Sequence, residues 1–117
     1  MVKKPTNPEV FLHHILESIE SIERFTNKVA QNEFRLNDEK QSAVIRKIEI
    51  IGEAVKNIPT DFKKKYPTIP WEEAAGMRNK LIHEYFGVDL FLVWKTIKSD
   101  LPKLKTQIQK IIKQQKL

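Results

Sequence analysis

Hydrophobic residues recur at intervals of three and four along most of the chain, the spacing of one face of an α-helix. The first stripe begins after Pro8 and predicts a helix to about Gln31; its members are Leu12, Ile15, Ile19, Ile22, Phe25 and Val29. A second stripe lies between Asp38 and Pro59, a residue that stops a helix; its members are Val44, Ile48, Ile51, Val55 and Ile58. Asp38 with Gln41 resembles a capping box, which predicts that this helix begins at Asp38.

The next segment predicts a connector and a third helix. Residues 60–70 form the connector, with one short helical turn over Asp61–Lys65. Pro70 suits the first turn of a helix, and Gly87 is a plausible end for it. The residues that share one face of this helix are Trp71, Ala74, Arg78, Leu81 and Tyr85.

A fourth helix is predicted after Asp89, whose carboxylate suits an N-cap. Its apolar stripe comprises Leu90, Trp94, Ile97, Leu101, Leu104, Ile108 and Ile111. Pro102 interrupts the hydrogen bonding without changing the periodicity, which predicts a kinked or closely restarted helix. We therefore expect an all-α fold, an antiparallel four-helix bundle with a short extra helical turn. Gly52 in the second helix costs about 1 kcal/mol against alanine, and a close approach of another helix is the best reason for it.

The composition limits the classes of protein to which the chain can belong. A chain of 117 residues has the length of one typical domain, so a single domain over residues 1–117 is expected. There are no cysteines, which removes disulfides, thiolate nucleophiles and cysteine zinc sites. No apolar run approaches the ~18 residues of a membrane span, and no signal peptide is visible. We expect no membrane association and a cytoplasmic protein.

The net charge of +6 lies entirely in the second half of the chain. Residues 1–58 carry nine basic and nine acidic side chains, whereas residues 59–117 carry twelve and six. A basic half suits an anionic partner such as nucleic acid, although a solvated, lysine-rich helix surface explains the same composition. The candidate RNA backbone contacts are Lys63, Lys64, Lys65, Lys103, Lys105, Lys110, Lys113 and Lys116.

The stretch from Arg78 to Phe86 concentrates side chains that can act on a phosphodiester. On a helix, Arg78 and Tyr85 share a face and Asn79 and His83 form an i,i+4 pair, while Arg78 and His83 are ~140° apart. Arginine offers forked donors to phosphate oxygens, and histidine moves protons near neutral pH. The alternative is an ordinary surface ion pair of His83 with a neighbouring carboxylate.

The same stretch gives little reason to expect a metal. The sequence after His83 lacks the second histidine of the H-E-x-x-H motif, and histidines are not clustered. His13 and His14 are expected to be exposed residues of the first helix. We expect no metal and no cofactor.

These residues resemble a known family. The R-x(4-6)-H pair is similar to the signature of the HEPN superfamily (higher eukaryotes and prokaryotes nucleotide-binding). More narrowly, R-N-x-x-x-H-x-Y-F over residues 78–86, followed by Gly-Val-Asp at 87–89, resembles the HepT-like toxins of HepT/MntA (type VII) toxin–antitoxin pairs. Further elements of the resemblance are Gly52-Glu53-Ala54, Trp71 with Gly76-Met77, and Leu101-Pro102.

The resemblance implies a dimeric, metal-independent endoribonuclease toxin with Arg78 and His83 from both protomers in a shared cleft. Cleavage through the RNA 2′-hydroxyl needs one group to accept a proton and another to donate one, so two copies of His83 would suffice. Arg78 would stabilise charge on the phosphorane, and Asn79 would orient the phosphate or the partner's His83. Glu53 is a candidate supporting residue, although a solvated helix position is an equal alternative.

The resemblance also implies a protein partner. HepT-like toxins are paired with a nucleotidyltransferase antitoxin that adenylylates the motif tyrosine, here Tyr85. The added bulk and negative charge would keep RNA out of an anion-binding cleft. Phe86 and Trp94 are expected in the core or a dimer interface. Two other functions stay open from the sequence: a non-catalytic HEPN subunit that binds nucleotide or RNA and partners a nucleotidyltransferase, and a structural helical dimer.

Overall fold

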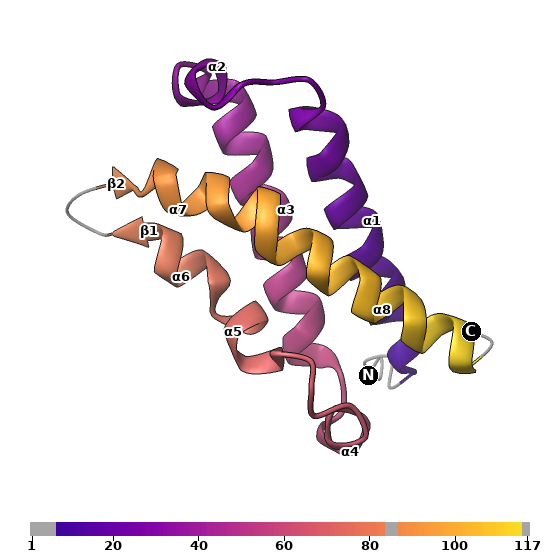
Figure 1. Ribbon diagram of the computed structural model, residues 1–117. Helices are drawn as coiled ribbons and strands as arrows, with labels where there is room; N and C mark the ends of the chain where they lie inside the picture. The colour runs from indigo at the N-terminus through magenta and orange to yellow at the C-terminus, as the bar shows by residue number, and fades with distance from the viewer. Residues whose placement is uncertain (1–6, 84–86, 116–117) are drawn as a thin grey trace, which may run out of the picture.

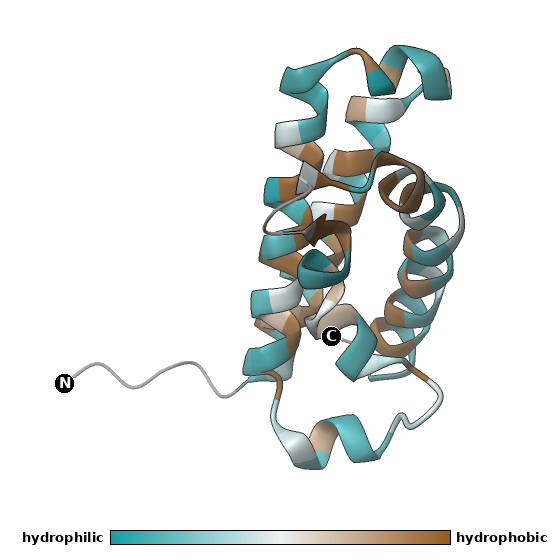
Figure 2. Ribbon diagram, turned by 90° about the vertical axis from the view of Figure 1, so that its left-hand side faces the viewer, coloured by the Kyte–Doolittle hydropathy of each residue, from teal (hydrophilic) through white to brown (hydrophobic). Residues whose placement is uncertain are grey.

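The computed structural model describes residues 7–83 and 87–115, with the backbone alone for His83. Helix α1 (Pro8–Thr26) and helix α3 (Asp38–Asn57) run antiparallel and pack along their lengths, and α8 (Leu101–Gln115) crosses α1 (Figure 1). Hydrophobic residues gather on the inner sides of the long helices and hydrophilic residues on the outer sides (Figure 2). The expectation of an all-α protein is confirmed in its main features.

Helix α1 begins where the sequence predicts. The Asn7 side chain accepts a hydrogen bond from the Glu9 backbone N–H at 2.9 Å, and Pro8 occupies the first turn. The stripe residues Leu12, Ile15, Ile19 and Ile22 are buried. The predicted end at Gln31 is wrong, because the helix stops at Thr26 and Lys28 adopts a positive φ of 59°. A five-residue helix, α2 (Gln31–Arg35), follows and buries Phe34.

Helix α3 has the predicted extent, but its cap differs from the prediction. Asn37, not Asp38, is the N-cap, since its side chain accepts from the Lys40 N–H at 3.0 Å. Gln41 does not complete a capping box. Its Nε2 donates to the carbonyl oxygens of Phe34 and Arg35, both at 2.9 Å, and so joins the end of α2 to α3.

The connector contains the expected short turn, as helix α4 (Thr60–Lys64). Trp71 Nε1 donates to the carbonyl oxygens of Lys63 and Tyr66, at 3.2 and 3.1 Å. Each of these carbonyl oxygens also accepts from a backbone N–H, that of Tyr66 and that of Ile69, so the indole adds a second donor to both. Trp71 thereby ties the connector to the segment that follows.

The predicted third helix to Gly87 is wrong beyond Leu81. The chain forms α5 (Trp71–Ala75), breaks at Gly76, and continues as α6 (Met77–Leu81). Two short strands then pair antiparallel, β1 (Ile82–His83) with β2 (Gly87–Val88), with Ile82 opposite Val88. Gly87 has a φ of 77°, so its conformational freedom serves the hairpin and not a helix end.

The last helical segment confirms the predictions for Asp89 and Pro102. The Asp89 side chain caps α7 (Leu90–Lys95) by accepting from the Leu92 N–H at 3.1 Å. A π-helical turn, η1 (Thr96–Asp100), links α7 to α8, and Leu101 N–H donates to the Thr96 carbonyl five residues back. The wider turn accommodates Pro102, which has no N–H to donate and whose ring crowds the preceding turn.

Gly52 lies at the close approach that the sequence predicts. A Cβ at this position would be 3.0 Å from the Ala75 carbonyl oxygen of α5. Both neighbouring segments are anchored, since Ile51, Ala54, Trp71 and Ala74 are buried. Within residues 7–83 and 87–115, no helix has the length and apolar character needed to cross a membrane.

Candidate functional site

Helix α6 carries two of the residues that the sequence singles out, Arg78 and Asn79. Met77 and Leu81 are buried at either end of its five residues, 8% and 1% exposed, and they fix the helix on the core. The side chains between them, Arg78, Asn79 and Lys80, are exposed. The apolar residues thus hold the backbone while the polar residues remain accessible to a ligand.

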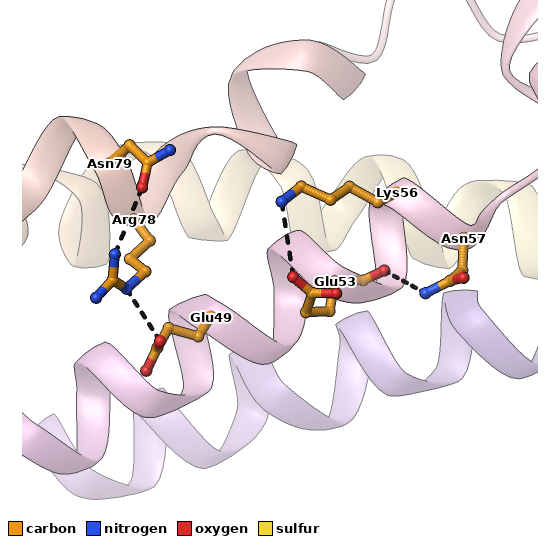
Figure 3. Close-up of polar contacts among 6 residues, drawn as sticks. All are labelled: Glu49, Glu53, Lys56, Asn57, Arg78 and Asn79. Carbon is orange, nitrogen blue, oxygen red and sulfur yellow. Dashed lines mark hydrogen bonds and ion pairs between the residues drawn. The ribbon is translucent and has the colours of Figure 1, made fainter.

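The guanidinium of Arg78 is bonded to α3. Its Nε donates to Glu49 Oε2 at 2.9 Å, and its Nη1 donates more weakly to Asn79 Oδ1 at 3.5 Å (Figure 3). The Arg78 side chain is 47% exposed and that of Glu49 is 33% exposed. Asn79 therefore lies beside the arginine on α6, and Glu49 faces it from the neighbouring helix.

These residues belong to the lining of a depression between α3 and the α5–α6 segment, which we call the Arg78 depression. Its volume is about 290 Å³, and it is lined by Arg46, Glu49, Gly52, Glu53, Lys56, Ala75, Arg78 and Asn79. Three of the lining side chains are basic and two are carboxylates. An anion entering the depression would meet guanidinium and ammonium donors, and the carboxylates would keep those donors partly neutralised in its absence.

Glu53, the predicted supporting residue, lies in the same lining but forms no hydrogen bond or ion pair with Arg78. Its carboxylate pairs with Lys56 at 3.6 Å, and its backbone carbonyl accepts from Asn57 at 2.8 Å (Figure 3). The residue that sequence reasoning missed is Glu49, one helical turn earlier. The i,i+4 relation between Glu49 and Glu53 is the signal that could have found it, because it places both carboxylates on one face of α3.

The sequence matches the family model "Ribonuclease HepT-like" over residues 15–111. The chain belongs to the HepT-like family. "Probable ribonuclease HepT" of Thermococcus cleftensis is 53% identical over 103 residues, which cover 88% of this chain and 94% of the relative. A "Putative RNase" of Caldanaerobacter subterraneus is 41% identical over 109 residues, 93% of this chain and 97% of that protein.

A longer relative is also similar. "Gamma-glutamylcyclotransferase and putative RNase" of Methanocaldococcus jannaschii is 53% identical over 106 residues, which are 91% of this chain and 48% of the relative. The HepT-like chain therefore spans about half the length of that protein. No solved structure matches the chain.

Helix α6 ends before the histidine of the HepT-like motif. The backbone of His83 is in strand β1, opposite Gly87. The expected i,i+4 pair of Asn79 and His83 is therefore wrong, as is any helical angle between Arg78 and His83, because α6 ends at Leu81. The His83 side chain, Tyr85 and Phe86 lie outside the described residues, so their predicted roles remain predictions.

The other candidates in this HepT-like chain are distributed over its surface. His14 is exposed as expected, and His13 is half-buried 3.9 Å from Glu9. Trp94 is half-buried and packs on Phe34, with ring centroids 5.4 Å apart. In the part of the chain that the structure describes, no three histidine or carboxylate side chains form a group able to hold a metal ion.

The candidate lysines differ in their surroundings. Lys105 is engaged within the chain, since its Nζ lies 2.7 Å from Glu23 Oε1. Lys63 is half-buried, and Lys116 lies outside the described residues. Five others are exposed: Lys64, Lys65, Lys103, Lys110 and Lys113.

Proposed function

We propose that this HepT-like protein is a metal-independent endoribonuclease and the toxin of a toxin–antitoxin pair. One observation carries the proposal: Arg78 and Asn79 lie side by side on α6, directly before the strand of His83, in the lining of a depression with three basic side chains and two carboxylates. Similarity supports it, since relatives of nearly the same length carry ribonuclease names. The proposed unit is a single HEPN domain in which α5–α6 takes the place of the third bundle helix.

The proposed reaction is cleavage through the RNA 2′-hydroxyl. The 2′-oxygen attacks the adjacent phosphorus while a base takes its proton, and the 5′-oxygen of the next nucleotide leaves as an acid protonates it. Arg78 stabilises the charge that develops on the phosphorane, because its N–H groups are strong donors to phosphate oxygens. Asn79 orients the phosphate, and His83 moves the proton.

A homodimer completes the proposed site. Base and acid are both needed, and the motif of one chain contains one histidine. A two-fold axis would bring His83 of each protomer to one cleft, since a symmetric interface repeats each residue across it. The exposed positions of Arg78 and Asn79 are compatible with such an arrangement.

The proposed antitoxin is a nucleotidyltransferase that acts on Tyr85. The tyrosine oxygen attacks the α-phosphorus of ATP, loses its proton and displaces pyrophosphate, which leaves AMP on Tyr85. An AMP group adds negative charge two residues from His83, and like charge repels RNA from the site.

Cleavage is tested by expressing the wild type, Arg78→Ala and His83→Ala in cells that lack the antitoxin, and by assaying the purified proteins on RNA with EDTA present. The wild type should stop growth and cleave RNA, and each variant should cleave about 10²–10⁴-fold more slowly. Equal growth and intact RNA in all three strains would overturn the proposal. Cleavage abolished by EDTA would overturn its metal-independent form.

The adenylylation step is tested separately by co-expression with a candidate nucleotidyltransferase. The wild-type mass should increase by one or more AMP units, and Tyr85→Phe should keep its unmodified mass. An unchanged wild-type mass, or equal modification of the variant, would contradict the assignment of Tyr85.

A further inference from the structure

Glu49 contacts the proposed catalytic arginine from a different part of the chain. It lies on α3, 29 residues before Arg78, and its Oε2 accepts from Arg78 Nε at 2.9 Å. Glu49 is the less exposed member of the pair, 33% against 47%. The carboxylate is therefore set into the wall of the Arg78 depression, and the guanidinium extends toward it from the opposite wall (Figure 3).

The bond leaves most of the guanidinium available. Arginine has five N–H groups, and Glu49 uses the one on Nε. Asn79 receives one from Nη1 at 3.5 Å, at the limit of a hydrogen bond. Among the described residues, Nη2 has no hydrogen-bond partner. Nη1 and Nη2 form the fork that recognises two oxygens of a phosphate. This fork remains available to a ligand, while Glu49 holds the Nε–H.

We propose that Glu49 is a positioning residue, which holds Arg78 in the orientation that meets the RNA phosphate; this rests on the proposed ribonuclease function. An arginine side chain has many rotamers, and a donor stabilises a transition state best when it is already oriented. An ion pair this exposed contributes little to folding. Its main effect is therefore on the direction of the guanidinium.

Removal of Glu49 has two opposite consequences. The loss of a negative charge from the depression favours binding of polyanionic RNA, so KM should fall or stay unchanged. The loss of orientation at Arg78 slows the chemical step, so kcat should fall. A carboxylate that only repelled RNA would lower KM and leave kcat unchanged, whereas a structural carboxylate would lower the melting temperature.

The kinetic test compares Glu49→Ala and Glu49→Gln with Glu23→Ala. Glu23 is a matched control, since it also forms an exposed ion pair between two helices, with Lys105 at 2.7 Å, away from the Arg78 depression. Glu49→Ala should lower kcat by about 10- to 100-fold, the scale of a misplaced catalytic group, at an unchanged melting temperature. Glu49→Gln, which keeps an acceptor oxygen for Nε–H, should recover part of that loss, and Glu23→Ala should keep the wild-type kcat.

A second measurement does not depend on activity. In a ¹H–¹⁵N spectrum of the arginine side chains, the Nε–H signal of Arg78, assigned by its loss in Arg78→Lys, should be sharp in the wild type and in Glu23→Ala. It should broaden or move to the position of a solvated arginine in Glu49→Ala. An unchanged signal in Glu49→Ala would overturn the proposal.

The outcomes separate the two proposals. If the wild type cleaves RNA and Glu49→Ala has the same kcat, the role of Glu49 is overturned and the ribonuclease function stands. If Glu53→Ala loses kcat and Glu49→Ala does not, the supporting carboxylate is Glu53 and the proposal is also overturned. If the wild type cleaves no RNA while the Arg78 signal depends on Glu49, the ribonuclease function fails and the catalytic role of Glu49 fails with it.

Discussion

Replacement of Gly52 by alanine tests whether α3 and α5 are in contact as closely as the structure indicates. The added Cβ would lie 3.0 Å from the Ala75 carbonyl oxygen, a backbone atom that cannot rotate away. Alanine in place of a helical glycine gains about 1 kcal/mol from helix propensity, whereas overpacking costs about 1–3 kcal/mol. The buried residues Trp71 and Ala74 hold α5 in place, so we expect the cost to exceed the gain.

The expected net effect of Gly52→Ala is a loss of about 1 kcal/mol, which corresponds to about 4 °C in Tm for a domain of this size. Urea and thermal unfolding of the same samples measure it. Gly76→Ala is the matched control, because a Cβ there would have ordinary contact, 3.5 Å from the Glu72 carbonyl oxygen. This variant should be neutral or gain up to about 1 kcal/mol. A Gly52→Ala protein that is stabilised by about 1 kcal/mol would refute the close contact.

Three further predictions concern side-chain hydrogen bonds and are measured by the same unfolding experiments. Asn37→Ala should cost about 1 kcal/mol and Asp38→Ala clearly less, since Asn37 caps α3; the reverse order would restore Asp38 as the cap. Asp89→Ala should cost about 1 kcal/mol through loss of the α7 cap, and an unchanged Tm would contradict that role. Trp71→Phe should cost about 1 kcal/mol through loss of the indole N–H bonds to the Lys63 and Tyr66 carbonyl oxygens, which both keep a backbone donor; an unchanged Tm would mean that the indole N–H contributes nothing to stability.

The long helices could be predicted from sequence because their burial is periodic. The stripes of α1, α3 and α8 are buried at nearly every predicted position. The end of α1 could not be predicted, because Val29 continues the spacing although the backbone has already turned at Lys28. Helix α2 was missed for the opposite reason: with five residues and one buried side chain, Phe34, it is too short to show a period.

In the region of the predicted third helix, the apolar residues are buried as predicted, but the secondary structure differs from the prediction. Trp71, Ala74 and Leu81 have helical spacing and all are buried, yet they lie on two short helices, α5 and α6, instead of one. The contacts that favour this path are not local. One example is the hydrogen bond from Asp89 N–H to the Leu81 carbonyl at 2.8 Å, which closes the hairpin eight residues after α6 ends.

Part of the candidate site could be predicted from neighbouring residues in the sequence, and part depends on how distant helices pack. The side chains of the motif are adjacent in the sequence, so Arg78 and Asn79 could be found from residue type and resemblance alone. Glu49 could not be assigned to Arg78, because their contact depends on how closely α3 and α6 pack, and spacing within one helix does not contain that distance.

Gly52 connects the stability of this region to the position of Arg78. It lies three residues after Glu49 on α3, and its missing side chain permits the approach of the segment that carries Arg78. A Cβ that displaces α5 should therefore also lengthen the Arg78–Glu49 bond. We expect Gly52→Ala to lower kcat on RNA at temperatures where the protein is fully folded, and to weaken the Arg78 Nε–H signal as Glu49→Ala does. If stability falls while kcat and that signal remain unchanged, the helix approach and the orientation of Arg78 are independent, and Glu49 holds the arginine without help from the packing of α5.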